Sequence, residues 1–176
     1  GIGKACADEL LQQGATLLAL DVNPAVEDLF EGPAAGGIVC DVTDSDAVDA
    51  AVEKAVRRFG GLDIVITNAG TFPPGLQIED LDDDAWTKVL DVNLHGHLRV
   101  LRAATPYLKI GIEPAVVVIA SKNVLAPGPG AAAYSAAKAG LTQLSRVAAL
   151  ELGEYGVRVN VLHPNAVFDT ALWTDE

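Results

Sequence analysis

Short apolar runs alternate along this chain with longer segments in which apolar residues recur every three or four positions. The runs are rich in β-branched residues and stop at turn-forming residues, a pattern typical of buried strands. We predict strands over residues 15–20, 38–40, 62–67, 115–120 and 157–162. The longer segments match the helical repeat of 3.6 residues and predict helices over residues 3–13, 47–59, 80–108 and 131–152.

Strands and helices that alternate in this way favour a parallel sheet with right-handed crossovers and helices on both faces. We therefore predict the α/β class: a Rossmann-like, doubly wound parallel sheet in a three-layer α/β/α arrangement, forming a single domain over residues 1–176. Ligands bind such sheets outside the carboxyl ends of the strands. The residues at these ends include Asp21, Asp41, Asn68, Ser121 and Pro164. Their convergence on one rim indicates a functional site.

Composition narrows the class of protein. Half of the 176 residues are apolar, enough for one sizeable core, and a formal net charge of −12 disfavours nucleic acid and anionic membranes as partners. No apolar run reaches the ~20 residues of a membrane span and no signal peptide is visible, so we expect a cytoplasmic protein. Cys6 and Cys40 lack the spacing of a metal site or a disulfide framework, and we expect buried thiols.

Tyr134 and Lys138 stand four residues apart in a predicted helix, so they lie one turn apart on the same face. A neighbouring cation lowers the pKa of a phenol from its reference value of ~10, and such a tyrosine can exchange a proton with an alcohol or carbonyl oxygen. Ser121, at the end of the preceding strand, could hold the same oxygen by a hydrogen bond. Because a Tyr-x-x-x-Lys spacing also arises by chance, the pair alone is weak evidence for a catalytic site, and its functional interpretation depends on the other motifs of the chain.

The chain opens with Gly1-Ile2-Gly3 at the start of a predicted helix. Glycines at a helix start let the backbone approach a phosphate, which the exposed N–H groups and the helix dipole then hold. Asp21 follows about twenty residues later, where a dinucleotide-binding fold holds the adenosine ribose hydroxyls. A carboxylate there repels a 2′-phosphate, which favours NAD over NADP. The alternative is an ordinary turn that begins at Asp21.

Two further positions admit both a functional and a structural interpretation. Asn68-Ala69-Gly70 follows a continuous apolar strand, and its small residues either let a ligand approach the backbone or form a plain turn. Asn93 lies at the edge of the apolar stripe of the predicted helix 80–108. A buried amide needs backbone, water or a bound group as its partner, because leaving it unsatisfied costs about 1 to 3 kcal/mol.

The ordered set of these motifs resembles the short-chain dehydrogenase/reductase family over nearly the whole chain. The set comprises Gly1-Ile2-Gly3, Asp21, Asp41-Val42, Asn68-Ala69-Gly70, Asn93, Ser121, Tyr134-x-x-x-Lys138 and Asn160-x-x-x-Pro164. The resemblance implies that Tyr134 is the acid/base and that Lys138 lowers its pKa and binds the nicotinamide ribose. It implies that Ser121 positions the substrate oxygen and that Asn93 holds a water of the proton relay. The other implied cofactor contacts are Gly1, Ile2, Gly3, Asp21, Asp41, Val42, Asn68, Ala69, Gly70, Pro164 and Thr170.

The chain departs from the family pattern in four places. The family's first strand would precede Gly1 and its last strand would follow Thr170, so the resemblance implies a fragment of a longer chain, with poor stability by itself. Thr67 replaces an asparagine, a modest change in turn packing. Asn165 stands in an expected Pro-Gly turn, and asparagine is the non-glycine residue best suited to a positive φ there.

Residues 121–124 and 164–170 are similar to the dehydrogenase half of bifunctional sugar-phosphate aldolase/dehydrogenases. This similarity implies a fused aldolase domain and a small hydroxyaldehyde or sugar-like substrate. We therefore expect an NAD(H)-dependent oxidoreductase that interconverts an alcohol and a carbonyl, assembled as a dimer or tetramer through the helices that carry Asn93 and Tyr134. The alternatives are a non-catalytic dinucleotide-binding module and an NADP(H)-dependent reductase of the 3-ketoacyl type.

Overall fold

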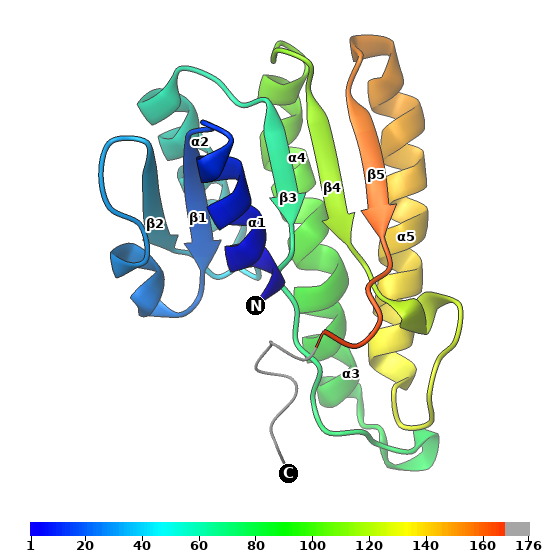
Figure 1. Ribbon diagram of the computed structural model, residues 1–176. Coiled ribbons are helices and arrows are strands. Elements are labelled where there is room, and N and C mark those ends of the chain that lie inside the picture. The colour runs from blue at the N-terminus through cyan, green and yellow to red at the C-terminus, as the bar shows by residue number, and fades with distance from the viewer. Residues whose placement is uncertain (168–176) are drawn as a thin grey trace.

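A computed structural model describes residues 1–167 of the chain (Figure 1). Its strands are β1 (Leu17–Asp21), β2 (Ala35–Val39), β3 (Ile64–Thr67), β4 (Ala115–Ile119) and β5 (Arg158–Leu162). Its α-helices are α1 (Ile2–Gln12), α2 (Ser45–Phe59), α3 (Asp83–Leu90), α4 (Gly96–Leu108) and α5 (Ala132–Leu152). The predicted alternation of strands and helices is confirmed.

All described strand pairs are parallel. β1 pairs with β2, and β4 lies between β3 and β5, with Val117 opposite Ile66 on one side and Asn160 on the other. Among the described residues, β1 and β3 do not pair with each other, so the strands form a two-stranded and a three-stranded sheet. In Figure 1 the two sheets stand side by side with their arrows pointing the same way. The carboxyl ends of the strands therefore lie on one side of the molecule.

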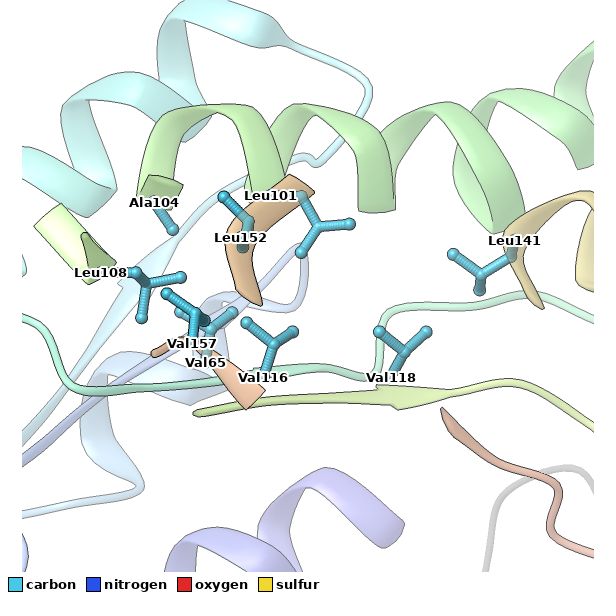
Figure 2. Close-up of a cluster of buried hydrophobic side chains, with 9 residues drawn as sticks. All are labelled: Val65, Leu101, Ala104, Leu108, Val116, Val118, Leu141, Leu152 and Val157. Carbon is cyan, nitrogen blue, oxygen red and sulfur yellow. The ribbon is translucent and has the colours of Figure 1, made fainter. Parts of the chain in front are cut away.

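Helices cover both faces of the strands. Figure 1 shows α1 in front of the strands, with α4 and α5 behind β3, β4 and β5. Side chains on the rear face form the main core, in which Val65, Val116 and Val118 point from the sheet toward α4 (Figure 2). Leu101 and Leu141 from α4 and α5 close this core from above. The three-layer Rossmann-like arrangement is thus confirmed.

Local signals fix the ends of α2. The Asp44 carboxylate caps its start and accepts hydrogen bonds from the backbone N–H groups of Asp46 (2.9 Å) and Ala47 (3.1 Å). Gly60 ends the helix with φ of 86°, a left-handed conformation that glycine adopts without steric cost. The predicted end at this glycine is confirmed.

The predicted helix 80–108 is divided. α3 and α4 are separated by a π-helical turn, Asp91–His95, which holds one residue more per turn than an α-helix. The extra residue rotates α3 relative to α4, so the single apolar stripe predicted along the whole segment was wrong. Trp86 and Leu98 remain 37% and 41% exposed, whereas Leu101 and Leu108 are buried.

Strand β2 begins earlier than predicted, at Ala35 within the Gly-rich loop. Its first residues pair with β1, Leu17 opposite Ala35 and Ala19 opposite Gly37. Position 37 has no room for a side chain, because a methyl group there would lie 1.8 Å from the carbonyl oxygen of Val26, in the short 3-10 turn Pro24–Asp28. Both cysteines are free; Cys40 is buried as predicted, while Cys6 is only half-buried. Within the described residues, no helix is long and apolar enough to cross a membrane.

Candidate active site and cofactor site

Lys138 lies buried at the carboxyl end of β4. Its ammonium group donates a hydrogen bond of 3.0 Å to the carbonyl oxygen of Ile119, the last residue of that strand. Burial lowers the pKa of Lys138 to about 8. The side chain is therefore still largely cationic at neutral pH, and it is fixed at the rim rather than reaching into solvent.

Tyr134 stands one turn before Lys138 on α5, and the lysine Nζ lies 5.8 Å from the centre of the phenol ring. The predicted neighbourhood of these two side chains is present. The ring of Phe72 meets the ring of Tyr134 edge-on, with 4.8 Å between their centres. Tyr134 and Phe72 also line a pocket of about 550 Å³ together with Leu76, Lys88 and residues of α3.

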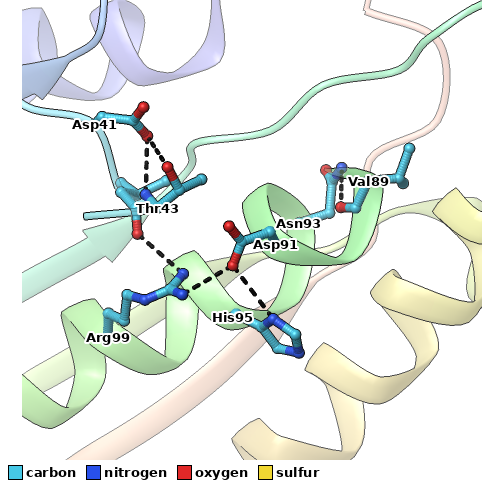
Figure 3. Close-up of polar contacts among 8 residues, drawn as sticks. Asp41, Thr43, Val89, Asp91, Asn93, His95 and Arg99 are labelled. Carbon is cyan, nitrogen blue, oxygen red and sulfur yellow. Dashed lines mark hydrogen bonds and ion pairs between the residues drawn. The ribbon is translucent and has the colours of Figure 1, made fainter. Parts of the chain in front are cut away.

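Asn93 is fully buried within the π-helical turn, and its amide is satisfied by backbone groups. Its Oδ1 accepts a hydrogen bond from the N–H of Thr71 (3.2 Å), and its Nδ2 donates to the carbonyl oxygens of Thr71 (2.9 Å) and Val89 (3.0 Å; Figure 3). Of the partners considered from the sequence, backbone is the one found here. Asn93 thereby holds the segment that follows β3 against the helix.

Gly70 lies beside both Asn93 and Lys138. A methyl group built on its α-carbon would lie 3.1 Å from Asn93 Oδ1 and 3.6 Å from Lys138 Nζ. Asn93, Lys138 and the exposed backbone of Gly70 therefore share one small region of the rim. A methyl group at position 70 would press on the Asn93 side chain and touch the Lys138 ammonium at ordinary contact distance.

Ser121 lies two residues beyond the end of β4 and is 8% exposed. Its Oγ accepts a weak hydrogen bond of 3.2 Å from the N–H of Asn123, which leaves the hydroxyl hydrogen free for another acceptor. Two hydrogen bonds join this segment to the residues that follow β5. His163 donates to the Ser121 carbonyl oxygen (3.0 Å), and the Lys122 N–H donates to the Pro164 carbonyl oxygen (3.0 Å). Pro164 is thus part of the rim, whereas Thr170 lies outside the described residues.

The start of α1 approaches the end of β3. A methyl group on Gly3 would come within 2.8 Å of the Nδ2 atom of Asn68. Gly1 is the N-cap of α1, and within residues 1–167 no side-chain hydrogen bond caps this helix start. The N–H groups at a helix start of this kind can bind a phosphate.

Asp21 and Asp41 occupy the adjoining strand ends. Asp21 is exposed, and its Oδ1 accepts a hydrogen bond from Asn23 N–H (2.9 Å), so the turn expected as the alternative interpretation is present. The Asp41 carboxylate accepts from the backbone N–H and the hydroxyl of Thr43 (both 2.8 Å), and these bonds hold the pKa of Asp41 below its usual value. Each turn uses only one carboxylate oxygen, so neither turn precludes a ligand.

Val42 connects this part of the rim to the helix that carries Asn93. A methyl group on Gly96 would collide with the Val42 side chain at 2.6 Å, so the two segments are in close contact. Arg99 donates to the Val42 carbonyl oxygen (3.4 Å) and forms an ion pair with the Asp91 carboxylate (2.8 Å); Figure 3 shows the contact with Asp91. Sequence reasoning missed Arg99, because a lone arginine on a helix gives no signal of its own.

His97 is the other residue that the sequence interpretation left without a role. It is 2% exposed, and its Nε2 lies 2.8 Å from the carbonyl oxygen of Ala69. Burial, together with repulsion from the nearby Lys138 ammonium, lowers the pKa of His97 to about 3. Its position four residues after Asn93, on the same helical face, was the signal available in the sequence.

The rim of the parallel strands carries exposed glycines, a carboxylate and a buried lysine beside a tyrosine. The chain matches the model of the short chain dehydrogenase family over residues 1–176. It therefore belongs to that family.

Relatives that are named dehydrogenases place the chain among the oxidoreductases that act on hydroxyl or carbonyl groups. The chain is 34% identical to 2,3-dihydro-2,3-dihydroxybenzoate dehydrogenase of Bacillus subtilis, covering 100% of this chain and 70% of the relative. It is 36% identical to trans-4-hydroxycyclohexanecarboxylate dehydrogenase of Sinomonas cyclohexanicum, covering 90% and 61%. The chain thus spans about two thirds of the length of these proteins.

Solved structures share the fold. A dehydrogenase/reductase from Sinorhizobium meliloti superposes with a TM-score of 0.91 at 32% identity, covering 100% of this chain and 71% of that one. A 3-ketoacyl-(acyl-carrier-protein) reductase from Brucella melitensis, solved in complex with NADH, gives 0.90 at 29% identity, covering 94% and 72%. The fold inferred from the sequence is therefore that of a large group of related enzymes.

Proposed function

We propose that the protein transfers a hydride reversibly between NAD(H) and a small alcohol or carbonyl substrate, with Tyr134 exchanging the hydroxyl proton. The observation that carries this proposal is the position of a buried Lys138 beside Tyr134, next to Gly70 and Asn93 at the carboxyl rim. Burying the Lys138 cation costs free energy, and buried charges of this kind cluster at functional sites.

The residues at the rim fit a dinucleotide. The start of α1, where no side chain of the described residues caps the helix, suits a pyrophosphate. Asp21 would hold the adenosine ribose, Asp41 and Val42 the adenine, and Asn68-Ala69-Gly70 the middle of the cofactor. When bound, the nicotinamide supplies the hydride chemistry.

We propose NAD rather than NADP as the cofactor. Asp21 is exposed and carries a carboxylate, so a 2′-phosphate beside it would meet a like charge. The structure of the Brucella reductase in complex with NADH supports this preference.

The proton transfer is assigned to residues of this chain. Tyr134 gives a proton to, or takes it from, the substrate oxygen, and the neighbouring Lys138 cation stabilises the phenolate. Ser121 has its hydroxyl hydrogen free to bond the same oxygen. Asn93 holds the Thr71 backbone in place and, by resemblance to the family, a water of the relay.

The substrate is proposed to be small. The pocket beside Tyr134 and Phe72 has a volume of about 550 Å³ and a mainly apolar lining that also includes Lys88 and Asp84. The hydroxyaldehyde or sugar-like polyol is proposed from the likeness of residues 121–124 and 164–170 to the sugar-phosphate aldolase/dehydrogenases. The alternative of a 3-ketoacyl-type reductase rests on the likeness to the Brucella structure. Assays with a polyol and a 3-ketoacyl ester would separate these two substrates.

We also propose that subunits associate through α4 and α5. Leu98 on α4 is 41% exposed, and Val147 and Leu150 on α5 are 41% and 83% exposed. Apolar side chains on these two helices are a reason to expect burial against a second copy. Sedimentation of the full-length protein would give the subunit number.

Replacement of Tyr134 by phenylalanine in the full-length protein tests the proposal. The variant keeps the ring that packs on Phe72 but loses the hydroxyl, so turnover measured at 340 nm should fall by at least about a thousandfold. NADH binding, followed by fluorescence, should change little. Retained turnover would refute the role of Tyr134, while a wild-type protein that binds NADH without turnover would favour a non-catalytic binding module.

A further inference from the structure

Arg99 on α4 joins two segments of the rim through two different nitrogens of its guanidinium group. Nη1 donates to the carbonyl oxygen of Val42 (3.4 Å), and Nη2 forms an ion pair with the Asp91 carboxylate (2.8 Å). Figure 3 shows the guanidinium group facing Asp91, beside the turn that carries Asp41 and Thr43. The Arg99 side chain is 22% exposed, so these two contacts satisfy a cation that is largely removed from solvent.

The first of the two segments is the turn that follows β2. Its residues Asp41 and Val42 are the ones proposed above to hold the adenine. The exposed Asp41 carboxylate accepts two bonds of 2.8 Å from Thr43, inside the same turn. The bonds from Thr43 and the positive charge of Arg99 together hold the pKa of Asp41 below its usual value. The arginine is therefore near both of the residues assigned to the adenine.

The second segment is anchored in the interior. Asp91 begins the π-helical turn Asp91–His95, which continues into α3 on one side and α4 on the other. Asn93, two residues after Asp91, is fully buried and bonds the backbone of Thr71 and Val89. Asp91 is thus a fixed point, whereas the turn that follows β2 lies at the surface.

A forked side chain suits the task of joining these segments. The nitrogens of a guanidinium group are held in one plane, so a contact with the fixed Asp91 also sets the position of the nitrogen that meets Val42. We propose that Arg99 is a positioning residue for the cofactor: anchored on Asp91, it holds the Asp41–Val42 turn in the place that receives the adenine. The inference rests on the proposed function for the identity of the cofactor.

The nicotinamide half of the cofactor should be indifferent to Arg99. Its proposed contacts, Tyr134 and Lys138, lie on α5, and Lys138 is held by the carbonyl oxygen of Ile119 (3.0 Å). These contacts depend on β4 and α5, whereas Arg99 acts on the turn after β2. The two halves can therefore be tested separately, and a merely structural role of Arg99 would affect both.

Binding of ADP-ribose to Arg99→Met in the full-length protein tests the proposal. Methionine keeps an apolar stem but removes both donors, while ADP-ribose contains the adenosine half of NAD and lacks the nicotinamide. Its dissociation constant, measured by calorimetry at a temperature where the variant is folded, should rise about fivefold, as expected for the loss of one hydrogen bond. The dissociation constant of reduced nicotinamide mononucleotide, which lacks the adenosine, should stay at the wild-type value.

Arg102→Met is the matched control on the same helix. Arg102 donates to the Ser45 hydroxyl (2.6 Å) at the start of α2, so its loss leaves the turn after β2 in place. This variant should bind ADP-ribose as tightly as the wild type.

A double variant shows whether Arg99 acts through its anchor. Asp91→Asn keeps the size of the side chain but removes the charge that holds the fork. It should weaken ADP-ribose binding in the wild-type background and have no further effect in Arg99→Met. Equal losses in both backgrounds would overturn the anchoring role of Asp91.

The remaining outcomes separate this inference from the proposed function. Unchanged ADP-ribose affinity in Arg99→Met would overturn the role of Arg99, and so would an equal loss of affinity for both half-cofactors, which indicates a general loosening of the fold. A wild type that binds ADP-ribose without any turnover would refute the proposed hydride transfer, while the binding data still decide the role of Arg99. A wild type that does not bind ADP-ribose would overturn both.

Discussion

Gly3 lies directly against the side chain of Asn68, so that a methyl group on Gly3 would approach its Nδ2 atom to 2.8 Å. The contact joins the start of α1 to the end of β3, two segments 65 residues apart in the sequence. Both segments belong to the proposed dinucleotide site. Position 3 therefore requires glycine because no side chain fits against Asn68, and not only because glycine is flexible.

Gly3→Ala should weaken NADH binding about tenfold. The added methyl group forces Asn68 to move, which distorts the proposed pyrophosphate cradle on both sides. Titration of NADH fluorescence would measure the change. Gly61→Ala is the control, because a methyl group at position 61 has no atom within 4 Å, and its dissociation constant should match that of the wild type. Equal binding by both variants would contradict the proposed cradle.

Phe72→Leu should lower kcat by a factor of about three to ten, with the substrate KM less affected than kcat. The edge-on contact with Tyr134 is worth about 0.5 to 1.5 kcal/mol, and its loss frees the phenol to leave the reactive position. Steady-state kinetics would test this. Phe59→Leu, at the end of α2, is the control aromatic substitution and should leave kcat unchanged. An unchanged kcat in Phe72→Leu would show that Tyr134 is held by other contacts.

Asp21→Asn should shift the cofactor preference toward NADPH by at least about tenfold. The amide keeps the oxygen that accepts from Asn23 N–H, so the turn is retained while the negative charge is lost. The ratio of kcat/KM for NADPH and NADH would report the shift. Asp28→Asn removes a charge from the neighbouring 3-10 turn and should leave the ratio as it is. The assignment of Asp21 to the ribose would not survive a ratio that is the same in both variants.

His97 should make the folded state sensitive to acid. Its pKa is about 3 in the folded protein against 6.5 for an unperturbed histidine, so between these values the unfolded chain binds a proton that the folded chain does not. Stability is therefore fully present above pH 6.5 and falls by about 1.4 kcal/mol per pH unit as the pH drops toward 3. Urea unfolding at several pH values would measure the slope. His97→Gln should reduce it, whereas His95→Gln should not; equal slopes in all three proteins would contradict this burial.

Much of the fold follows from simple patterns in the sequence. The run of β-branched residues at Ala115–Ile119 and the helical repeat of Leu141, Leu144 and Leu152 both depend on burial, which the pattern of apolar residues reports directly. The ends of the strands could also be predicted, since Asp21 and Asn68 interrupt apolar runs. Because parallel strands end on one side, these residues had to share a rim.

The missed features depend on contacts between distant segments. Strand β2 starts early because Ala35, Gly36 and Gly37 pair with β1, and small residues carry no apolar pattern that predicts this pairing. His97 and Arg99 bond carbonyl oxygens that belong to other strand ends, at Ala69 and Val42. A side chain that serves a distant backbone group carries no periodic signal, so its partner becomes known only with the fold.

The extra residue in the π-helical turn at Asp91–His95 determines how α3, which lines the pocket, is oriented relative to α4. Deletion of one residue there, such as Val92, would restore an ordinary helix and turn α3 by about 100° relative to α4. The carbonyl oxygen of Val89 would swing away from the Asn93 amide, and the wall of the pocket beside Tyr134 would turn with it. The one extra residue of this turn thus sets the orientation of the pocket wall formed by α3 relative to the phenol of Tyr134.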